Sequence, residues 1–421
     1  MNYLPTWPLE VTPLITFGLL LLIGSIGGYL AHRISWLPSV TGFLLVGFTF
    51  GTGGIGLLNH EVIAQAQIFT DVALALILYR LGLSLDIRAI SKFPRLLIIA
   101  LFEGSLTFGL VFLVLYLLGV DTLIATLVGT IAISSSPAVL LHVAHEVEAK
   151  GVVTDSTMTL VALNNLFSFV AFSAVIPVMH YSSGSDWTTI ILQPTYQLLG
   201  SLVLGLVVAY GLHAASLKTH QASQYKLALV IGAIMISVGL ANELKLSALF
   251  APLIIGVVIK TIERKTVVSN LEFGAAFELF FIVLFVFAGA NLHMKELIHF
   301  APAVLALVVV RCLAKTVGAT FMSVVLGRTF RVGVSSGMLL IPMAGLAIGL
   351  VHTSSQLFPQ NAAMIAAIVL GAVTVFETIG PPIASFAFRL SGESGAMRDK
   401  EDVGESAEAR PASPAQQQGQ A

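Results

Sequence analysis

Long uncharged stretches constrain the fold of this chain more than any other feature. Only 10% of the 421 residues are charged and 57% are hydrophobic, whereas about a quarter of a soluble domain is charged. A helix needs about 20 mainly apolar residues to cross a bilayer. With proline, glycine and charge clusters taken as boundaries, thirteen such segments lie near residues 11–31, 36–58, 62–83, 95–119, 121–143, 153–180, 191–215, 225–241, 246–262, 273–290, 299–326, 332–353 and 361–388. We therefore predict an all-α polytopic membrane protein with about 13 transmembrane helices.

The lysines and arginines predict the orientation of these segments. Loops that follow odd-numbered segments hold twelve of them: Arg33, Arg88, Lys92, Arg95, Lys150, Lys218, Lys226, Lys260, Arg264, Lys265, Arg328 and Arg331. Loops that follow even-numbered segments hold only Lys245 and Lys295. Because cytoplasmic loops carry the excess of cations, we expect the N-terminus outside and the C-terminus in the cytoplasm. The predicted location is the cell membrane, in a bacterium the inner membrane.

The predicted domain organisation is simple. Residues 1–390 form one membrane domain, and residues 391–421, rich in Ala, Gln, Glu, Ser and Pro, read as a disordered cytoplasmic tail. Cys312 is the only cysteine, which excludes an intrachain disulfide or a cysteine metal cluster. The histidines show no metal-ligand spacing, so we expect neither a metal nor another cofactor.

Two adjacent amides, Asn164 and Asn165, lie in the middle of the sixth apolar segment. Burying two amides in hydrocarbon without partners costs several kcal/mol. Polar side chains at this depth usually face a water-filled cavity or a neighbouring helix, which makes the pair a candidate ion site. The alternative is that both amides merely join helices by hydrogen bonds.

An internal repeat surrounds this pair. Segments four to six resemble segments eleven to thirteen, and each set opens with a long segment that carries an off-centre ionisable group, Glu103 or Lys315. The middle segment of each set is interrupted, by Ser134, Ser135, Ser136 and Pro137 in the first and by Pro342 among glycines in the second. These residues either kink packed helices, which membrane helices tolerate, or mark a site.

The third segment of each set carries polar groups, Asn164 and Asn165 in one and Glu377 in the other. Corresponding segments of the two sets are seven places apart along the chain, an odd number, so the sets have opposite orientations. Inverted repeats with matching interrupted helices are typical of secondary transporters, whose site lies between the breaks. The candidate ion-binding residues are Ser134, Ser135, Ser136, Asn164, Asn165, Lys315, Glu103 and Glu377.

Five short motifs in a fixed order resemble those of one known superfamily. They are Leu-Gly-Leu-Ser-Leu-Asp at 81–86, Phe-Ala-Gly-Ala-Asn-Leu at 287–292, Arg-Cys-Leu-Ala-Lys-Thr-Val-Gly at 311–318, Ala-Gly-Leu-Ala-Ile-Gly-Leu at 344–350 and Phe-Glu-Thr-Ile-Gly-Pro at 376–381. With the inverted repeat, they resemble the cation:proton antiporter superfamily, in the branch of the sodium/proton and Kef-type potassium/proton antiporters. The resemblance covers about residues 12–390. It implies two crossed, interrupted helices and a homodimer in which a core domain moves against a dimerisation domain.

The resemblance also implies roles for single residues. Asn164 and Asn165 stand where relatives carry an Asp-Asp or Asn-Asp ion-binding pair, and Lys315 matches a lysine that pairs with one of those carboxylates. Residues 134–137 match the unwound stretch of the first crossed helix, where relatives often carry an aspartate. This chain lacks all of these aspartates, so Lys315 is expected to have lost its carboxylate partner.

The leading hypothesis is a secondary transporter that exchanges Na⁺ or K⁺ for protons, with no nucleic-acid partner. Since an amide has no proton to lose near neutral pH, Lys315 is our first choice of proton carrier and Glu103 or Glu377 the second. The alternative is an exchange-deficient relative that acts as a passive cation pathway or as a sensor or regulatory protein. No common hydrolase or metalloprotease motif is present, so we do not expect an enzyme.

The same ionisable groups could instead have purely structural roles. Glu103 or Asp71 could simply balance Arg80, Arg311 or Lys315. Glu377 could hold an interhelical hydrogen bond, and Arg311 could anchor the core domain.

Overall fold

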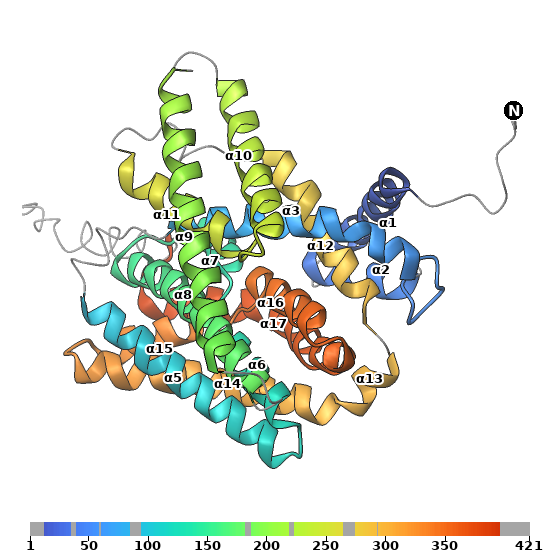
Figure 1. Ribbon diagram of the computed structural model, residues 1–421. Coiled ribbons are helices and arrows are strands. Elements are labelled where there is room, and N and C mark those ends of the chain that lie inside the picture. Colours follow the sequence, from blue (N-terminus) through green and yellow to red (C-terminus); the bar gives the residue numbers. More distant parts are fainter. Residues whose placement is uncertain are drawn as a thin grey trace, which may run out of the picture.

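The computed structural model describes residues 12–34, 39–58, 60–84, 94–181, 187–218, 223–263, 274–292 and 294–395, and these residues are almost entirely helical (Figure 1). The first group of helices comprises α1 (Pro13–Arg33), α2 (Ser39–Phe50), α3 (His60–Ser84), α5 (Pro94–Leu117), α6 (Thr122–Ala132), α7 (Pro137–Glu146), α8 (Val152–Tyr181) and α9 (Trp187–Lys218). The remaining helices are α10 (Ser223–Glu243), α11 (Phe250–Ile262), α12 (Gly274–Ala290), α13 (Met294–His299), α14 (Ala301–Val325), α15 (Phe330–Leu339), α16 (Gly345–Leu357), the short η1 (Pro359–Asn361) and α17 (Ala362–Ser391).

The fold class predicted from the sequence is confirmed. Nine helices of the described residues are long and apolar enough to cross a membrane, and three shorter apolar helices accompany them. With the interrupted pair of α15 and α16, the described residues hold about thirteen candidate crossings. The chain is a multi-pass membrane protein.

Both predicted triplets are present. Helix α5 is followed by the broken pair α6 and α7 and then by α8, and α14 is followed by the broken pair α15 and α16 and then by α17. In the first break, α7 begins at Pro137. A proline is tolerated at the first position of a helix, because the N–H that it lacks would have no partner within the helix there. Ser136 caps this helix, since its hydroxyl accepts a hydrogen bond from the amide of Val139. In the second break, Pro342 lies between the end of α15 and the start of α16.

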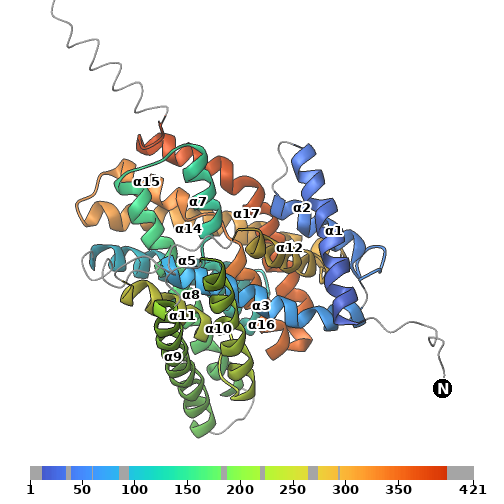
Figure 2. The same cartoon turned by 90° about the horizontal axis from the view of Figure 1, so that it is seen from above.

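The two triplets pack together as one bundle. Helix α5 runs along α14, and α17 contacts α7, α14, α15 and α16. The helices α1 to α3 and α9 to α12 form a second bundle. Within the whole molecule, α1 and α2 lie on the opposite side from α5 and α15 (Figure 2). The two bundles meet where α3 contacts α16, α2 contacts α17, and α8 contacts α9.

The segment that follows α17 packs against the start of α8. The carboxylate of Glu393 accepts hydrogen bonds from the amides of Val153 and Thr154, at 2.6 and 2.8 Å, and from the Thr154 hydroxyl at 2.7 Å. The amide of Gly395 also donates to the carbonyl of Val147. Residues 391–395, which the sequence assigned to the tail, are therefore packed against the membrane domain, and 396–421 lie outside the described residues.

Candidate functional site

The two helix breaks meet each other in the middle of the first bundle. The amide of Ser136 donates a hydrogen bond to the carbonyl of Pro342 at 2.8 Å, and the hydroxyl of Ser135 donates to the carbonyl of Leu340 at 2.8 Å. The side chains of Ser134, Ser135 and Ser136 are all buried. The unwound stretches thus touch directly, which is the crossing that the resemblance implied.

Arg311 of α14 joins both breaks through their backbone carbonyls. Its guanidinium is fully buried and donates to the carbonyls of Ala132 and Ser134 on one side and of Leu340 and Ile341 on the other. These carbonyls lie at the C-terminal ends of α6 and α15, where a helix presents unsatisfied acceptors and partial negative charge. The side chain therefore compensates two helix ends at once, and this fits the anchoring role considered for it.

Lys315, one helical turn further along α14, has a carboxylate partner. Its ammonium lies 2.9 Å from Oε1 of Glu103 on α5 and donates to the carbonyl of Ile133 at 2.6 Å, with both charged side chains fully buried. The expectation that Lys315 has lost its partner is therefore wrong, because the carboxylate comes from α5 and not from the asparagine positions on α8. Gly318 allows this approach, since a Cβ there would lie only 3.2 Å from the Cα of Glu103.

Asn164 binds the second carboxylate oxygen of Glu103. Its Nδ2 donates to Oε2 of Glu103 at 2.7 Å, while the hydroxyl of Thr107 donates to Oε1 at 2.8 Å. Glu103 thus accepts from an ammonium, an amide and a hydroxyl. The carbonyl oxygen Oδ1 of Asn164 is buried and has no hydrogen-bond partner. A buried acceptor in this position usually marks a functional group or the place of a bound ion or water.

Asn165 points toward the first break. Its Oδ1 accepts from the amide of Ser135 at 3.0 Å and its Nδ2 donates to the carbonyl of Ser135 at 2.8 Å. The side chain therefore replaces, at one residue of the unwound stretch, the two hydrogen bonds that a regular helix would supply. This use of Asn165 agrees with the helix-joining alternative, whereas Asn164 keeps a free oxygen.

Glu377 lies apart from this network. Its side chain is 2% exposed, and its Oε1 has no hydrogen-bond partner, which argues against the interhelical hydrogen bond considered above. Two nearby residues of α17 contact the elements around the crossing. Phe376 places its ring 4.7 Å from the guanidinium carbon of Arg311, and Gly380 packs against Pro342, with a Cβ at Gly380 lying 3.1 Å from the proline ring.

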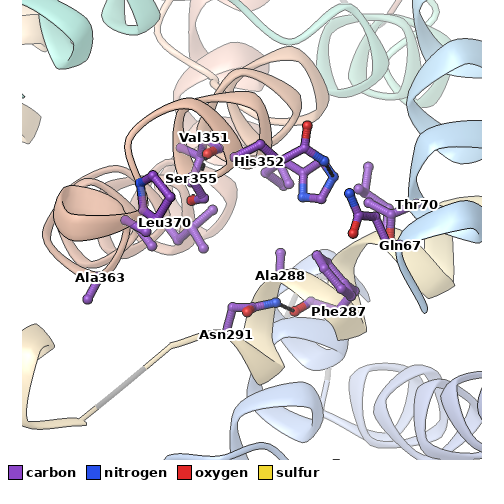
Figure 3. A pocket seen from close by; sticks show the side chains of 16 residues that line it. Gln67, Thr70, Phe287, Ala288, Asn291, Val351, His352, Ser355, Ala363 and Leu370 are labelled. Carbon is purple, nitrogen blue, oxygen red and sulfur yellow. Dashed lines mark hydrogen bonds between the residues drawn. The ribbon is translucent and has the colours of Figure 1, made fainter. Parts of the chain in front are cut away.

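A cavity of about 330 Å³ opens between the two bundles. Figure 3 shows His352, Gln67 and Thr70 on one side of it and Ala363 and Leu370 on the other. His352 lies 3.3 Å from a carboxylate oxygen of Asp71, so this is the partner that the structure gives to Asp71.

Sequence reasoning missed this cavity. Its sixteen lining residues come from α3, α12 and the turn after it, α16, η1 and α17, and no single segment shows an unusual polar pattern. The one available signal was the spacing of His352 and Gln356, which places both on one helix face, where their side-chain nitrogens lie 3.0 Å apart. Within the described residues, no group of three or more His, Cys, Asp and Glu side chains is placed to hold a metal ion.

Comparisons with known proteins agree with this architecture. The profile of the family described as "Sodium/hydrogen exchanger, transmembrane" matches residues 18–387. A curated relative, the ammonium/H(+) antiporter subunit AmhT of Alkalihalophilus pseudofirmus, is 21% identical over 368 residues, covering 84% of this chain and 92% of the relative.

The solved structures with a similar fold include the sodium proton antiporter MjNhaP1 of Methanocaldococcus jannaschii at pH 8. It matches with a TM-score of 0.71 and 18% identity, covering 90% of this chain and 97% of that one. An electron-microscopy structure of the same antiporter matches with a TM-score of 0.64 and 19% identity, covering 89% and 96% of the two chains. Since the family profile spans nearly the whole membrane domain, this chain belongs to the transmembrane sodium/hydrogen exchanger family.

Proposed function

We propose that this protein is a secondary antiporter that exchanges a monovalent cation, Na⁺ or K⁺, for protons across the cell membrane. The observation that carries the proposal is the buried network at the helix crossing, in which Lys315 and Glu103 form an ion pair beside the free Oδ1 of Asn164. An intramembrane ion pair is costly to maintain and usually belongs to an ion or proton pathway.

The network supplies oxygen ligands for a cation only when Lys315 is neutral. As long as the ammonium is charged, it occupies the carboxylate of Glu103 and would repel a second cation. When its Nζ gives a proton to water, Glu103 and Oδ1 of Asn164 become free to bind Na⁺ or K⁺, since hard cations prefer carboxylate and carbonyl oxygens. Binding of the cation and binding of the proton thus exclude each other, which is the coupling that antiport requires.

The neighbouring polar groups hold this network in place. Ser134, Ser135 and Ser136 lie in the unwound stretch whose carbonyls at Ile133 and Ser134 face Lys315 and Arg311. Asn165 fixes Ser135, as described above. We assign these residues to positioning the site, and Asn164, Glu103 and Lys315 to binding the cation and the proton.

The test is a flux measurement in proteoliposomes. Purified protein is reconstituted with a pH-sensitive dye inside the vesicles, and Na⁺, K⁺ or ammonium is added outside over a pH series. Proton efflux that depends on one of these cations supports the proposal, and the ranking of the three gives the substrate. Matched vesicles with Lys315→Gln are expected to show no pH-dependent flux.

A second candidate is an exchange-deficient family member that acts as a passive cation pathway or a regulatory subunit. It is favoured by the use of Asn165, whose amide is fully occupied by Ser135, and by the absence of a carboxylate at both asparagine positions. The relative AmhT is itself named as an antiporter subunit. Cation flux without proton movement, or no flux with any of the three cations, would favour this second function.

We also propose a homodimer in the bacterial inner membrane with the N-terminus outside and the C-terminus in the cytoplasm. The distribution of lysines and arginines supports the orientation. A reporter fused after Lys218 should then be active only in the cytoplasm. Chemical cross-linking in the native membrane tests the dimer.

A further inference from the structure

Two arginines at one end of the first bundle, Arg95 and Arg328, act on each other without a carboxylate to balance them. Arg95 is exposed in the first turn of α5, and Arg328 is half-buried in the turn between α14 and α15. Burial and the charge of Arg95 both lower the pKa of the Arg328 guanidinium. Among the described residues, neither arginine lies within 4 Å of an acidic side chain. Two cations held together in this way repel each other until an anion binds beside them.

The local structure holds Arg328 in this position. Gly327 ends α14 with a φ of +82°, a conformation that favours glycine. The backbone amide of Arg328 then donates to the carbonyl of Ser323 at 2.9 Å, and its Nη1 donates to the hydroxyl of Ser156 on α8 at 3.3 Å. A guanidinium has five N–H donors, and within the described residues only this one is used. The remaining donors can bind an oxyanion.

An apolar surface of α5 and α14 adjoins the two arginines. Ile98 and Leu101, in the two turns that follow Arg95 on α5, are 44% and 48% exposed. Phe321 of α14 is 55% exposed and stacks on Phe102 of α5, with ring centroids 5.5 Å apart. In a membrane, such a surface contacts acyl chains. The arginines lie at its end, at the level where the phosphates of the lipids begin.

We propose that Arg95 and Arg328 bind the phosphate of an anionic phospholipid, whose acyl chains lie on the apolar surface of α5 and α14. The orientation proposed above puts both arginines on the cytoplasmic side, where the leaflet carries anionic lipids. A phosphate accepts bidentate, charge-assisted hydrogen bonds from guanidinium groups, so one phosphate can join two of them. The adjoining apolar surface favours a lipid over a free anion.

This site lies on the same two helices as the ion pair of Lys315 and Glu103. Glu103 follows Arg95 by about two turns of α5, and its side chain is buried inside the bundle. Repulsion between the two arginines pushes the start of α5 away from the end of α14, and a bound phosphate removes that repulsion. We therefore expect the lipid to stabilise the packing of α5 on α14. This effect does not depend on which ion the protein transports.

The experiment compares native protein, Arg95→Gln, Arg328→Gln, the double variant and the control Arg33→Gln in neutral detergent micelles. Arg33 ends α1, on the opposite side of the molecule from α5 (Figure 2). The micelles contain phosphatidylglycerol, phosphatidylcholine with the same acyl chains, or no lipid but dissolved glycerol phosphate. The thermal midpoint of unfolding is followed by circular dichroism while the lipid or the glycerol phosphate is titrated.

We expect phosphatidylglycerol to raise the midpoint of the native protein and of Arg33→Gln clearly more than phosphatidylcholine or glycerol phosphate does. Each single substitution should weaken the apparent affinity for phosphatidylglycerol about fivefold, the effect of one cation near an anionic membrane surface. The double variant should respond equally to the two lipids.

Three results would overturn the inference without touching the proposed exchange. Equal midpoints of the native protein in the two lipids would mean that another anion, such as a carboxylate of residues 396–421, balances the arginines. A preference for phosphatidylglycerol that survives in the double variant would place the lipid elsewhere. A glycerol phosphate effect as large as the lipid effect would mean that the site takes a free phosphate.

Hydrogen exchange of the native protein covers the case in which the variants fail to fold. Phosphatidylglycerol, compared with phosphatidylcholine, should slow exchange in the first two turns of α5 and at residues 326–329, and not in the last turn of α1. Equal exchange in the two lipids at α5 and at residues 326–329 would overturn the assignment.

Discussion

The ion pair of Lys315 and Glu103 makes a quantitative prediction about stability. Both side chains are fully buried, and they lie 2.9 Å apart. Removing one partner of a buried pair leaves the other charge uncompensated, which typically costs about 3–5 kcal/mol of unfolding free energy. We therefore expect Glu103→Gln and Lys315→Gln each to destabilise the protein by an amount in this range.

The surroundings of the two charges predict which substitution lowers the unfolding free energy more. Without Lys315, the carboxylate of Glu103 keeps two hydrogen-bond donors, from Thr107 and Asn164. Without the Glu103 carboxylate, the ammonium of Lys315 keeps only neutral acceptors among the described residues, the carbonyl of Ile133 and the amide oxygen that Glu103→Gln introduces. Each remaining hydrogen bond to a charged group contributes about 1.5–3 kcal/mol. Glu103→Gln should therefore be the more destabilising of the two substitutions.

The double variant decides whether the cost comes from the stranded charge. If it does, Glu103→Gln with Lys315→Gln should cost clearly less than the sum of the two single variants, with a coupling energy of about 2 kcal/mol. Unfolding is followed by circular dichroism in mixed micelles at pH 7. Lys295→Gln and Glu296→Gln, on the short helix α13, are the matched controls and should stay within about 0.5 kcal/mol of the native protein. Additive single effects would refute the argument.

Three further predictions concern the same framework. Asn165→Ala removes both hydrogen bonds to Ser135 and should lower the unfolding free energy by about 2 kcal/mol, whereas Asn242→Ala, at an exposed position, should have little effect in the same denaturation assay. Glu393→Gln removes the charge at the start of α8 and should cost about 1 kcal/mol; faster hydrogen exchange confined to the first turn of α8 is the measurement, and unchanged protection there would contradict it. Lys315→Arg keeps the charge but not the ability to lose it, so proton-coupled flux should vanish while the thermal midpoint stays closer to native than in Lys315→Gln; coupled flux in this variant would contradict the lysine mechanism.

The parts of the fold that the sequence predicted are those with a local signal. Apolar length, with proline, glycine and charge clusters as boundaries, located the membrane helices. Helix-weakening residues located the breaks: Pro137 cannot lie inside α6 and α7 as one helix, and Pro342 separates α15 from α16 in the same way. Polar residues within apolar segments also identified Glu103, Asn164 and Lys315, because burying them demands a partner.

The sequence carries no comparable local signal for which helices pack against each other. The resemblance led us to expect Lys315 without a carboxylate partner, because relatives carry that carboxylate at the positions of Asn164 and Asn165, whereas α5 supplies it. The sequence offered Glu103 as a counter-charge only alongside Asp71, and for Arg80 or Arg311 as much as for Lys315. Whether two helices approach closely enough depends on their mutual register and on small residues such as Gly318 at the contact. Neither property follows from the apolar pattern of one helix. For the same reason the cavity around His352, built from five separate elements, could not be seen in any one of them.

The two cations of α14 illustrate how partners divide structural from functional roles. Arg311 and Lys315 lie one turn apart on the same helix and face the same crossing. Arg311 donates its hydrogen bonds to backbone carbonyls and packs against the ring of Phe376, and its guanidinium stays charged at any physiological pH. It can therefore hold the breaks together through the whole cycle without taking part in the exchange. Lys315 meets the carboxylate of Glu103, an oxygen ligand that a metal cation can also bind, and its ammonium can lose a proton. On α14, Arg311 thus fixes the geometry of the crossing, while Lys315 allows the charge at the crossing to change.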